Sequence, residues 1–408
     1  MAECVRASWV LPIHRPPIQD GWVHVQHGRI VSVGDGPAPG ATIDLRERFG
    51  PVALLPGLVN AHTHLELSWM AGRVSPAPSM ERWISSMMAI RRAGPDGGDA
   101  EILSAAAVAL AVAMKTGTVA FGDVTNGLAM VPVLEAAGAS AVIFHEVLGF
   151  NPLDVRALVH DARARLHAAL PSGMSGTVVA HAPYSTAPDL FREIARTHEG
   201  PAPLSVHLAE SRDEMEFLSD ATGPMRELLE RLGVWSGRWQ APGAHPVQFL
   251  KSLGYLQPGT LLVHGVHFSA SDLDQVREAG AVIVTCPRSN TWVGGGVPPI
   301  ARFYGAGVPV AVGTDSLASV DSLNLFDELA AMRRLAPEVD AARFLESATR
   351  VGAAALRLNH DVGQLAPGCL ARGVAVATPP LSSARDVEEY LVSGIPSSAI
   401  TPLAMPSC

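Results

Sequence analysis

The chain has 408 residues, of which 48% are apolar and 17% are charged, and its formal net charge at pH 7 is −9. This length suits one large α/β barrel domain with an appended piece, or two or three ordinary domains. The sequence contains no cluster of Lys and Arg, which argues against a nucleic-acid partner because phosphate binding requires a basic stripe.

The cysteines and the apolar stretches indicate the compartment. Cys4, Cys286, Cys369 and Cys408 are far apart and form no CxxC pair, so we expect no disulfide framework. The N-terminus lacks the pattern of a signal peptide, and the apolar stretch at 102–114 is too short to cross a bilayer. We therefore expect a cytoplasmic protein that does not contact a membrane.

Both ends of the chain contain short strand-like runs. Residues 22–25 and 29–33 form strand-like runs that are broken by Gly and Pro turns, and a similar run lies at 373–377. The tail from Ser393 is rich in Ser and Pro and is expected to be poorly structured.

Between these runs, apolar strand candidates alternate with helical stretches. The strand candidates are 52–60, 118–123, 140–146, 177–181, 204–207, 260–264, 282–285 and 308–313, and the clearest helix candidates are 79–92, 100–114 and 211–232. Strands of this kind are typical of parallel βα units, and eight units favour a (β/α)8 TIM-type barrel. A doubly wound sheet is the alternative, but no G-x-G-x-x-G follows the first strand.

Polar residues follow nearly every predicted strand. His62 and His64 lie at i and i+2, so both imidazoles can reach one metal ion from the same side of a strand. An isolated H-x-H also fits two unrelated histidines on a solvated face. The later strands end near Asp123, His145, Glu146, His181, His207, Glu210, His264 and Asp315. Any one of these could be a structural histidine or a helix cap, but together they predict an active site at the C-terminal ends of the strands.

The motifs HTHLEL, HAPYS, HLAES, CPRSN and GTDSLAS resemble those of the amidohydrolase superfamily, in its adenosine- and cytosine-deaminase-like branch. The resemblance covers essentially the whole chain. It implies a hydrolase barrel over 56–350 and a small β domain built from 1–55 and from 351–408 with the tail. The family also implies a homodimer and a small-molecule substrate.

The resemblance assigns roles to the residues at the strand ends. His62, His64, His207 and Asp315 would bind one divalent metal ion, with Zn²⁺ the expected metal and Fe²⁺ or another divalent ion as alternatives. The catalytic residues would be Glu210, His264 and Asp315, and His181 would bind substrate. The only lysines, Lys115 and Lys251, lie in helix-like segments and are not placed to bridge two metals, which disfavours a binuclear amide or phosphoester hydrolase.

These roles imply hydrolytic deamination. The metal would activate water, Asp315 would accept its proton, and Glu210 would protonate the ring nitrogen beside the attacked carbon, with loss of ammonia. His264 would orient the water or polarise the reacting carbon. Glu210 also opens an acidic run, so an ordinary helix N-terminal acid is the alternative, but its spacing from His207 favours the catalytic role.

Three stretches point to a substrate. HTHLELS, GTDSLAS and the helix SMERWISSMMAIRR resemble the aminofutalosine deaminases of menaquinone biosynthesis, which deaminate a nucleoside whose sugar carries a carboxyphenyl group. A cation should meet that carboxylate, and Arg288 is the best-placed candidate, ahead of Arg82 and Arg92. Arg288 could equally form a salt bridge at the barrel rim. Glu66 could bind a ribose hydroxyl or an amine, or support the metal ligands.

Several alternatives remain open. The nearest are deaminases of methylthioadenosine, S-adenosylhomocysteine or adenosine, and a chlorohydrolase-type enzyme acting on triazines is further away. A metal-free barrel kept as a binding or scaffold protein would be expected to lose a ligand or the acid, whereas all of them are present. Arg372 stands where the family pattern near the last β piece usually has Asp.

Overall fold

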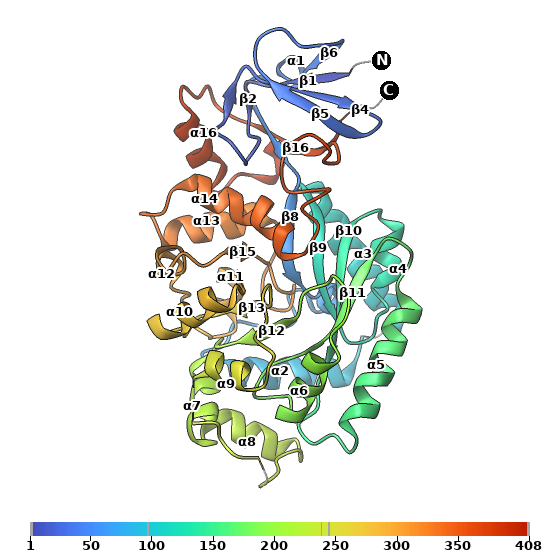
Figure 1. Cartoon of the computed structure of the whole chain (residues 1–408), viewed down its shortest axis with the longest axis vertical. Coiled ribbons are helices and arrows are strands. Elements are labelled where there is room, and N and C mark those ends of the chain that lie inside the picture. The colour runs from blue at the N-terminus through green and yellow to red at the C-terminus, as the bar shows by residue number, and fades with distance from the viewer. Residues whose placement is uncertain (1–2, 96–97, 238, 244, 406–408) are drawn as a thin grey trace. The chain divides into compact units, whose positions relative to one another are not determined.

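The computed structural model describes residues 3–95, 98–237, 239–243 and 245–405. The chain divides into two compact units (Figure 1). The first comprises Met1–Ala61, Ala111–Phe121 and Asn324–Cys408, and the second comprises His62–Leu110 and Gly122–Leu323. No helix in the described part of the chain combines the length and the apolar character needed to cross a membrane.

The first unit contains two small sheets. One has the order β5-β4-β1-β6, and the other has the order β17-β16-β7-β2-β3. The strands are β1 (Cys4–Arg6), β2 (Trp9–Val10), β3 (Ile18–Gln19), β4 (Trp22–Gln26), β5 (Arg29–Gly34), β6 (Thr42–Asp44), β7 (Val52–Pro56), β16 (Arg372–Ala377) and β17 (Ile400–Ala404). Apolar side chains of both sheets, such as Val23, Leu54 and Ala375, share one core cluster. The second sheet therefore joins strands from the two ends of the chain.

The expectation of a poorly structured tail from Ser393 is wrong for most of its length. β17 pairs antiparallel with β16, with Ile400 opposite Val376. The buried side chains of Ile400 and Met405 explain the ordering, since each removes apolar surface from water. Residues 406–408 of the predicted tail lie outside the described residues.

The predicted parallel strands form two four-stranded sheets. Their orders are β11-β10-β9-β8 and β12-β13-β14-β15. The strands are β8 (Leu58–Thr63), β9 (Thr118–Thr125), β10 (Ser140–Val147), β11 (Ser175–Ala180), β12 (Ser205–Leu208), β13 (Leu261–His264), β14 (Val282–Thr285) and β15 (Val310–Val312). The pairs β10/β11, β12/β13, β13/β14 and β14/β15 are parallel, as alternation with helices predicts.

Hydrogen bonds within the second unit also connect the edges of these two sheets. Beyond β11, the carbonyl oxygen of His181 accepts from the amide of His207 in β12 at 3.0 Å. At the other edge, the carbonyl oxygen of His62 accepts from the amides of Thr314 and Asp315, each at 3.1 Å. These bonds join the end of β11 to β12, and β8 to the end of β15.

The first predicted strand, 52–60, is in fact two strands in different sheets. β7 and β8 are separated at Gly57, whose amide donates to the carbonyl oxygen of Arg372 at 3.0 Å. A Cβ atom at Gly57 would lie 2.3 Å from a methyl carbon of Val119. The change of sheet therefore requires a residue without a side chain, because any larger residue would overlap Val119.

Helices follow most of the parallel strands. They are α2 (Met80–Ala93), α3 (Gly98–Lys115), α4 (Val131–Ala136), α5 (Val155–Ala169), α6 (Pro188–Arg196), α7 (Arg212–Asp220), α8 (Gly223–Arg231), α9 (Pro246–Ser252), α10 (Ala270–Ala279), α11 (Pro287–Trp292) and α12 (Ile300–Gly305). The first unit adds α1 (Arg46–Phe49), α13 (Leu325–Leu335), α14 (Ala341–Glu346), α15 (Gly352–Ala355) and α16 (Ala384–Leu391).

The single helix predicted over 211–232 is broken into α7 and α8. Ala221 takes a left-handed conformation with φ of 62°, and Gly223 and Pro224 begin the next helix. Proline cannot donate the hydrogen bond that would continue a helix and clashes with the preceding turn, so the apolar periodicity restarts on a new axis. The break lets α8 contact α2.

Candidate active site

Three histidine side chains converge at the ends of β8 and β12. His62 lies in β8, His64 follows that strand, and His207 lies in β12. The Nε2 atom of His64 lies 3.2 Å from Nε2 of His62 and 3.2 Å from Nε2 of His207. A tetrahedral ion with metal–nitrogen bonds of about 2.0–2.1 Å separates its nitrogen ligands by about 3.3 Å. The spacing of the three atoms therefore fits coordination of one ion.

Burial keeps these imidazoles neutral, the form that binds metal. It holds the pKa of His62 well below its usual range, and lowers the pKa of His64 to about 3 and that of His207 to about 4. Nδ1 of His207 lies 2.9 Å from the carbonyl oxygen of His181, which can only accept a hydrogen bond. Nδ1 therefore carries the proton, and the lone pair of Nε2 faces the other two histidines.

Asp315 supplies an oxygen beside the histidines. Its Oδ1 atom lies 3.6 Å from Nε2 of His64. Its Oδ2 atom accepts hydrogen bonds from the hydroxyl groups of Ser289 at 2.6 Å and Ser319 at 3.2 Å. Two serines thus hold one carboxylate oxygen, and the other lies near Nε2 of His64. Three imidazoles and a carboxylate are a donor set that suits a divalent ion such as Zn²⁺.

Glu210 and His264 form a second buried pair. Oε1 of Glu210 lies 3.4 Å from Nε2 of His264, and the two residues are 4% and 0% exposed. Burial, with the nearby carboxylates of Asp315 and Glu214, raises the pKa of Glu210 well above its usual range. Nδ1 of His264 lies 2.9 Å from the side-chain amide nitrogen of Asn290, which fixes the imidazole ring. The raised pKa favours the neutral, protonated form of Glu210 beside His264.

Three non-glycine residues near the strand ends have left-handed backbone conformations. Ala209 has a φ of 53°, His264 of 80° and Asp315 of 61°. Such conformations cost about 1–3 kcal/mol each and persist where the surroundings enforce them. Here they lie at His264 and Asp315 themselves and beside Glu210, so the strain coincides with the groups proposed to carry the chemistry.

The sequence analysis did not assign a role to Glu214, which holds the turn that carries Glu210. Its two carboxylate oxygens accept hydrogen bonds from the backbone amides of Ala209 at 3.0 Å and Glu210 at 2.9 Å. The sequence offered one indication of this role: Glu214 lies four residues after Glu210, in the first turn of α7.

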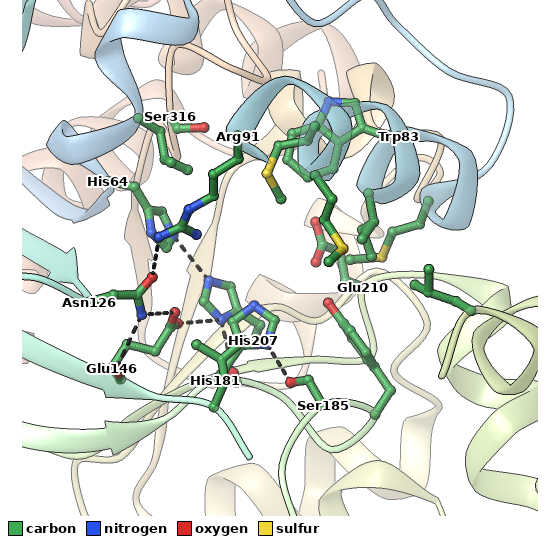
Figure 2. A pocket seen from close by; sticks show the side chains of 18 of the residues that line it. His64, Trp83, Arg91, Asn126, Glu146, His181, Ser185, His207, Glu210 and Ser316 are labelled. Carbon is green, nitrogen blue, oxygen red and sulfur yellow. Dashed lines mark hydrogen bonds and ion pairs between the residues drawn. The ribbon is translucent and has the colours of Figure 1, made fainter. Parts of the chain in front are cut away.

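The cluster lies in a cavity of about 420 Å³, a volume typical of small-molecule sites. Its polar residues include Glu66, Glu146, Glu210 and Asp315. Much of its apolar lining comes from two helices, which we call the α2–α8 wall: Met80, Trp83, Ile84, Met87 and Met88 of α2, with Met225, Leu228 and Leu229 of α8. The cavity therefore joins a reactive polar end to an apolar side (Figure 2).

A polar network also lines the cavity. Oε2 of Glu66 accepts from the Thr125 hydroxyl at 2.8 Å and from the Asn126 amide at 3.0 Å. Nη2 of Arg91 donates to Oδ1 of Asn126 at 3.1 Å and lies 3.7 Å from Oε1 of Glu66. The Asn126 side chain donates in turn to Glu146 at 3.1 Å. Figure 2 shows Arg91 extending toward Asn126 and His64.

Of the three predicted substrate-binding residues, two line the cavity and the third is not among its described lining residues. His181 lines the cavity, and its Nδ1 lies 2.5 Å from the Ser185 hydroxyl. Glu66 also lines it. Arg288 is not among the described lining residues, and its guanidinium contacts Ser322 and pairs with Asp321. Its role toward substrate stays a prediction.

Comparisons with known proteins place the chain in a family. The amidohydrolase family matches residues 53–400. A 5-methylthioadenosine/S-adenosylhomocysteine deaminase of Halobacterium salinarum is 29% identical over 385 residues, covering 90% of this chain and 83% of the relative. An aminodeoxyfutalosine deaminase of Deinococcus radiodurans is 31% identical over 319 residues, covering 75% of this chain and 73% of the relative.

A solved structure shows the same fold. The aminofutalosine deaminase of Helicobacter pylori, in complex with methylthio-coformycin, superposes with a TM-score of 0.82 over 97% of both chains at 24% identity. The protein is therefore a hydrolase with an α/β fold built on parallel sheets. It belongs to the amidohydrolase family, whose members depend on metal.

Proposed function

We propose that the protein is a zinc-dependent hydrolytic deaminase of an adenine nucleoside with an enlarged sugar substituent. Aminodeoxyfutalosine, in menaquinone biosynthesis, is the leading candidate. The observation that carries the proposal is the position of Glu210, which is buried beside His264 at the ends of the strands that bring together three imidazoles and Asp315. Removing an amino group from a ring needs an acid for the ring nitrogen and an activated water, and these residues supply both requirements in one place.

The proposed metal site consists of His62, His64, His207 and Asp315. A divalent ion held there would make a water molecule nucleophilic near neutral pH. One ion is expected, because no lysine is placed to bridge two metals. Lys115 at the end of α3 and Lys251 in α9 are exposed, and neither is among the described cavity-lining residues. Zinc is proposed from the nitrogen-rich donor set, with Fe²⁺ as the alternative.

The protein's own groups would move the protons. Asp315 would accept a proton from the attacking water, and Ser289 and Ser319 hold its carboxylate in place for that transfer. Glu210 would donate its proton to the ring nitrogen beside the attacked carbon. His264, fixed by Asn290, would orient the water against that carbon. Asp315 would then return its proton to the amino nitrogen, the C–N bond would break, and ammonia would leave. Glu210 would take back a proton from the new hydroxyl group, so that the ring carbon keeps the oxygen as a carbonyl.

The remaining cavity supports a nucleoside with a substituent. Glu66 and His181 are proposed to contact the sugar and the base, and the α2–α8 wall offers apolar surface to a group attached to the sugar. The relatives that act on methylthioadenosine and S-adenosylhomocysteine favour those nucleosides as second candidates. Adenosine itself and the triazines of chlorohydrolases leave more of this wall uncovered and are less favoured.

Ammonia release from a panel of substrates tests the proposal. Zinc-loaded protein should be assayed with aminodeoxyfutalosine, S-adenosylhomocysteine, methylthioadenosine, adenosine and guanine, with Glu210→Gln as the control. Selective turnover of aminodeoxyfutalosine that is lost in Glu210→Gln is the expected result. Turnover of another nucleoside would retain the mechanism and change the pathway. No ammonia from any purine would refute the nucleoside assignment.

The proposal includes a closed architecture. Hydrogen bonds from His207 to His181 and from Thr314 to His62 join the sheet edges, which supports a (β/α)8 barrel over 56–350. The sheet that pairs β7 with β16 supports a small β domain made of residues 1–55 and 351–408. A cytoplasmic homodimer is proposed from the family resemblance, and analytical ultracentrifugation would test the dimer.

A further inference from the structure

We infer that Arg91 is the specificity-determining residue of this site, and that it binds a carboxylate at the end of an apolar substituent on the nucleoside. The inference rests on the proposed nucleoside deaminase function and names the substrate class more narrowly. It depends on three features of the second unit: the apolar wall, the position of Arg91 on it, and the charges around the cavity.

The α2–α8 wall is built to face an apolar group. Its methionines, including Met87, Met88 and Met225, have flexible and polarizable side chains that adapt to rings and thioethers. The two helices are tied together where α2 begins, because Arg231 of α8 pairs with Glu81. The carboxylate of Asp213 also accepts from the Glu81 backbone amide at 3.2 Å. These contacts hold the wall in place before a ligand arrives.

Arg91 lies on the same face of α2 as the wall. Trp83, Met87 and Arg91 follow one another at intervals of four residues, and all three line the cavity. Among the described lining residues, Arg91 is the only arginine, and none is a lysine. The neighbouring cations Arg82 and Arg92 are not among these lining residues.

The guanidinium of Arg91 keeps donors for a ligand. Both of its described contacts, to Asn126 and to Glu66, use Nη2. The 3.7 Å separation from Glu66 is longer than a direct hydrogen bond, and the side chain is 49% exposed. Nη1 and Nε form no hydrogen bond or ion pair within the described part of the chain, and Nη2 uses one of its two N–H groups for Asn126. A carboxylate binds bidentately to two parallel N–H groups, which here would be the second N–H of Nη2 with that of Nη1 or Nε.

The charges of the cavity explain why a cation is needed. Besides the protonated Glu210, three acidic side chains line it, those of Glu66, Glu146 and Asp315, and they disfavour an anionic group close to them. Arg91 offsets that repulsion at one place, where the polar network meets the apolar wall. A neutral substituent would need only the wall, whereas an apolar body that ends in a carboxylate would use the wall and Arg91 together.

Arg91→Met is the test, because methionine keeps the apolar stem and removes the charge. We expect kcat/KM for the carboxylate-bearing substrates, aminodeoxyfutalosine and S-adenosylhomocysteine, to fall about 10–100-fold through a higher KM. For methylthioadenosine, which is neutral, kcat/KM should change less than about threefold. Arg92→Met is the matched control on the same helix and should behave like the wild type. Equal losses with charged and neutral substrates would overturn the inference, since Arg91 would then act by positioning Glu66 and Asn126.

Equilibrium binding separates this inference from the proposed function. The dissociation constants of aminodeoxyfutalosine and methylthioadenosine are measured by calorimetry with the wild type and with Arg91→Met, at low and high salt. We expect the substitution and high salt to weaken the binding of aminodeoxyfutalosine but not that of methylthioadenosine. If no nucleoside is deaminated but this selectivity remains, the proposed function fails and the role of Arg91 stands. If binding shows no dependence on Arg91, the inference fails even when deamination is observed.

Discussion

The strand ends and the α2–α8 wall form opposite parts of one cavity and are held by different forces. At the strand ends, directional hydrogen bonds fix three residues. His207 donates to the carbonyl oxygen of His181, Asp315 accepts from Ser289, and the backbone amide of Glu210 donates to Glu214. The wall is held mainly by packing, with polar contacts where α2 begins. Directional bonds fix atoms within tenths of an ångström, which metal binding and proton transfer require, whereas apolar packing tolerates ligands of different shape.

Removing one strand-end ligand should have the largest effect. His207→Ala is expected to lose the bound metal and to abolish ammonia release, because the remaining donors cannot complete the site. Metal content measured by mass spectrometry and activity should disappear together. His160→Ala, an exposed histidine of α5, is the control and should retain both. A fully metal-loaded and active His207→Ala enzyme would contradict the assigned ligand set.

The buried histidines should make the metal-free protein sensitive to acid. Burial lowers the pKa of His64 to about 3 and those of His181 and His207 to about 4, while unfolded histidine titrates near 6.5. Between these values the unfolded chain binds protons that the folded protein does not, so the free energy of unfolding decreases as the pH falls below about 6.5. The slope approaches about 1.4 kcal/mol per pH unit for each such histidine.

Urea denaturation of the metal-free protein between pH 7.5 and pH 5 measures this effect. His181→Asn should show a shallower decrease than the wild type, because one buried titrating group has been removed. A free energy of unfolding that stays constant across this range would mean that the imidazoles become protonated in the folded state. Water would then reach these histidines in spite of their burial.

A smaller effect is expected when a supporting hydrogen bond is removed. Ser289→Ala deletes the 2.6 Å hydrogen bond to Asp315, so that carboxylate should be oriented less well. Metal affinity or kcat should fall about 10–100-fold, as is usual for groups that support a metal ligand. Thr291→Ala, on the same helix, should leave both unchanged. Full activity of Ser289→Ala would show that Ser319 alone is sufficient to hold Asp315.

The wall should give the smallest effect and a different kinetic signature. Met87→Ala removes apolar surface near the substituent, so KM should rise by about tenfold or less while kcat is kept. Ser86→Ala, at an exposed position of α2, is the control. A large loss of kcat in Met87→Ala would mean that the wall also positions the reacting atoms, and the division between the two parts of the cavity would then be wrong.

The alternation of apolar strands and helices predicted the parallel sheets, since buried strands and amphipathic helices have distinct local patterns. The predicted strand-end residues His62, His64, His207, Glu210, His264 and Asp315 do lie together. Two predictions failed at a local break: Gly57 divides the first strand, and Ala221 to Pro224 divide the helix over 211–232. The Gly and Pro residues could be seen in the sequence. Whether they would break the strand or the helix depended on contacts with Val119 and on the packing of α8.

The sequence by itself determined which groups meet at the polar end. Residues that end parallel strands collect at one edge of a sheet, so order along the chain is enough to bring them together. Only the tertiary structure decided that Arg91, rather than Arg82 or Arg92, lines the cavity, and that Glu214 and Asn290 hold Glu210 and His264. These contacts depend on how helices pack against partners far away in sequence, which no local pattern encodes.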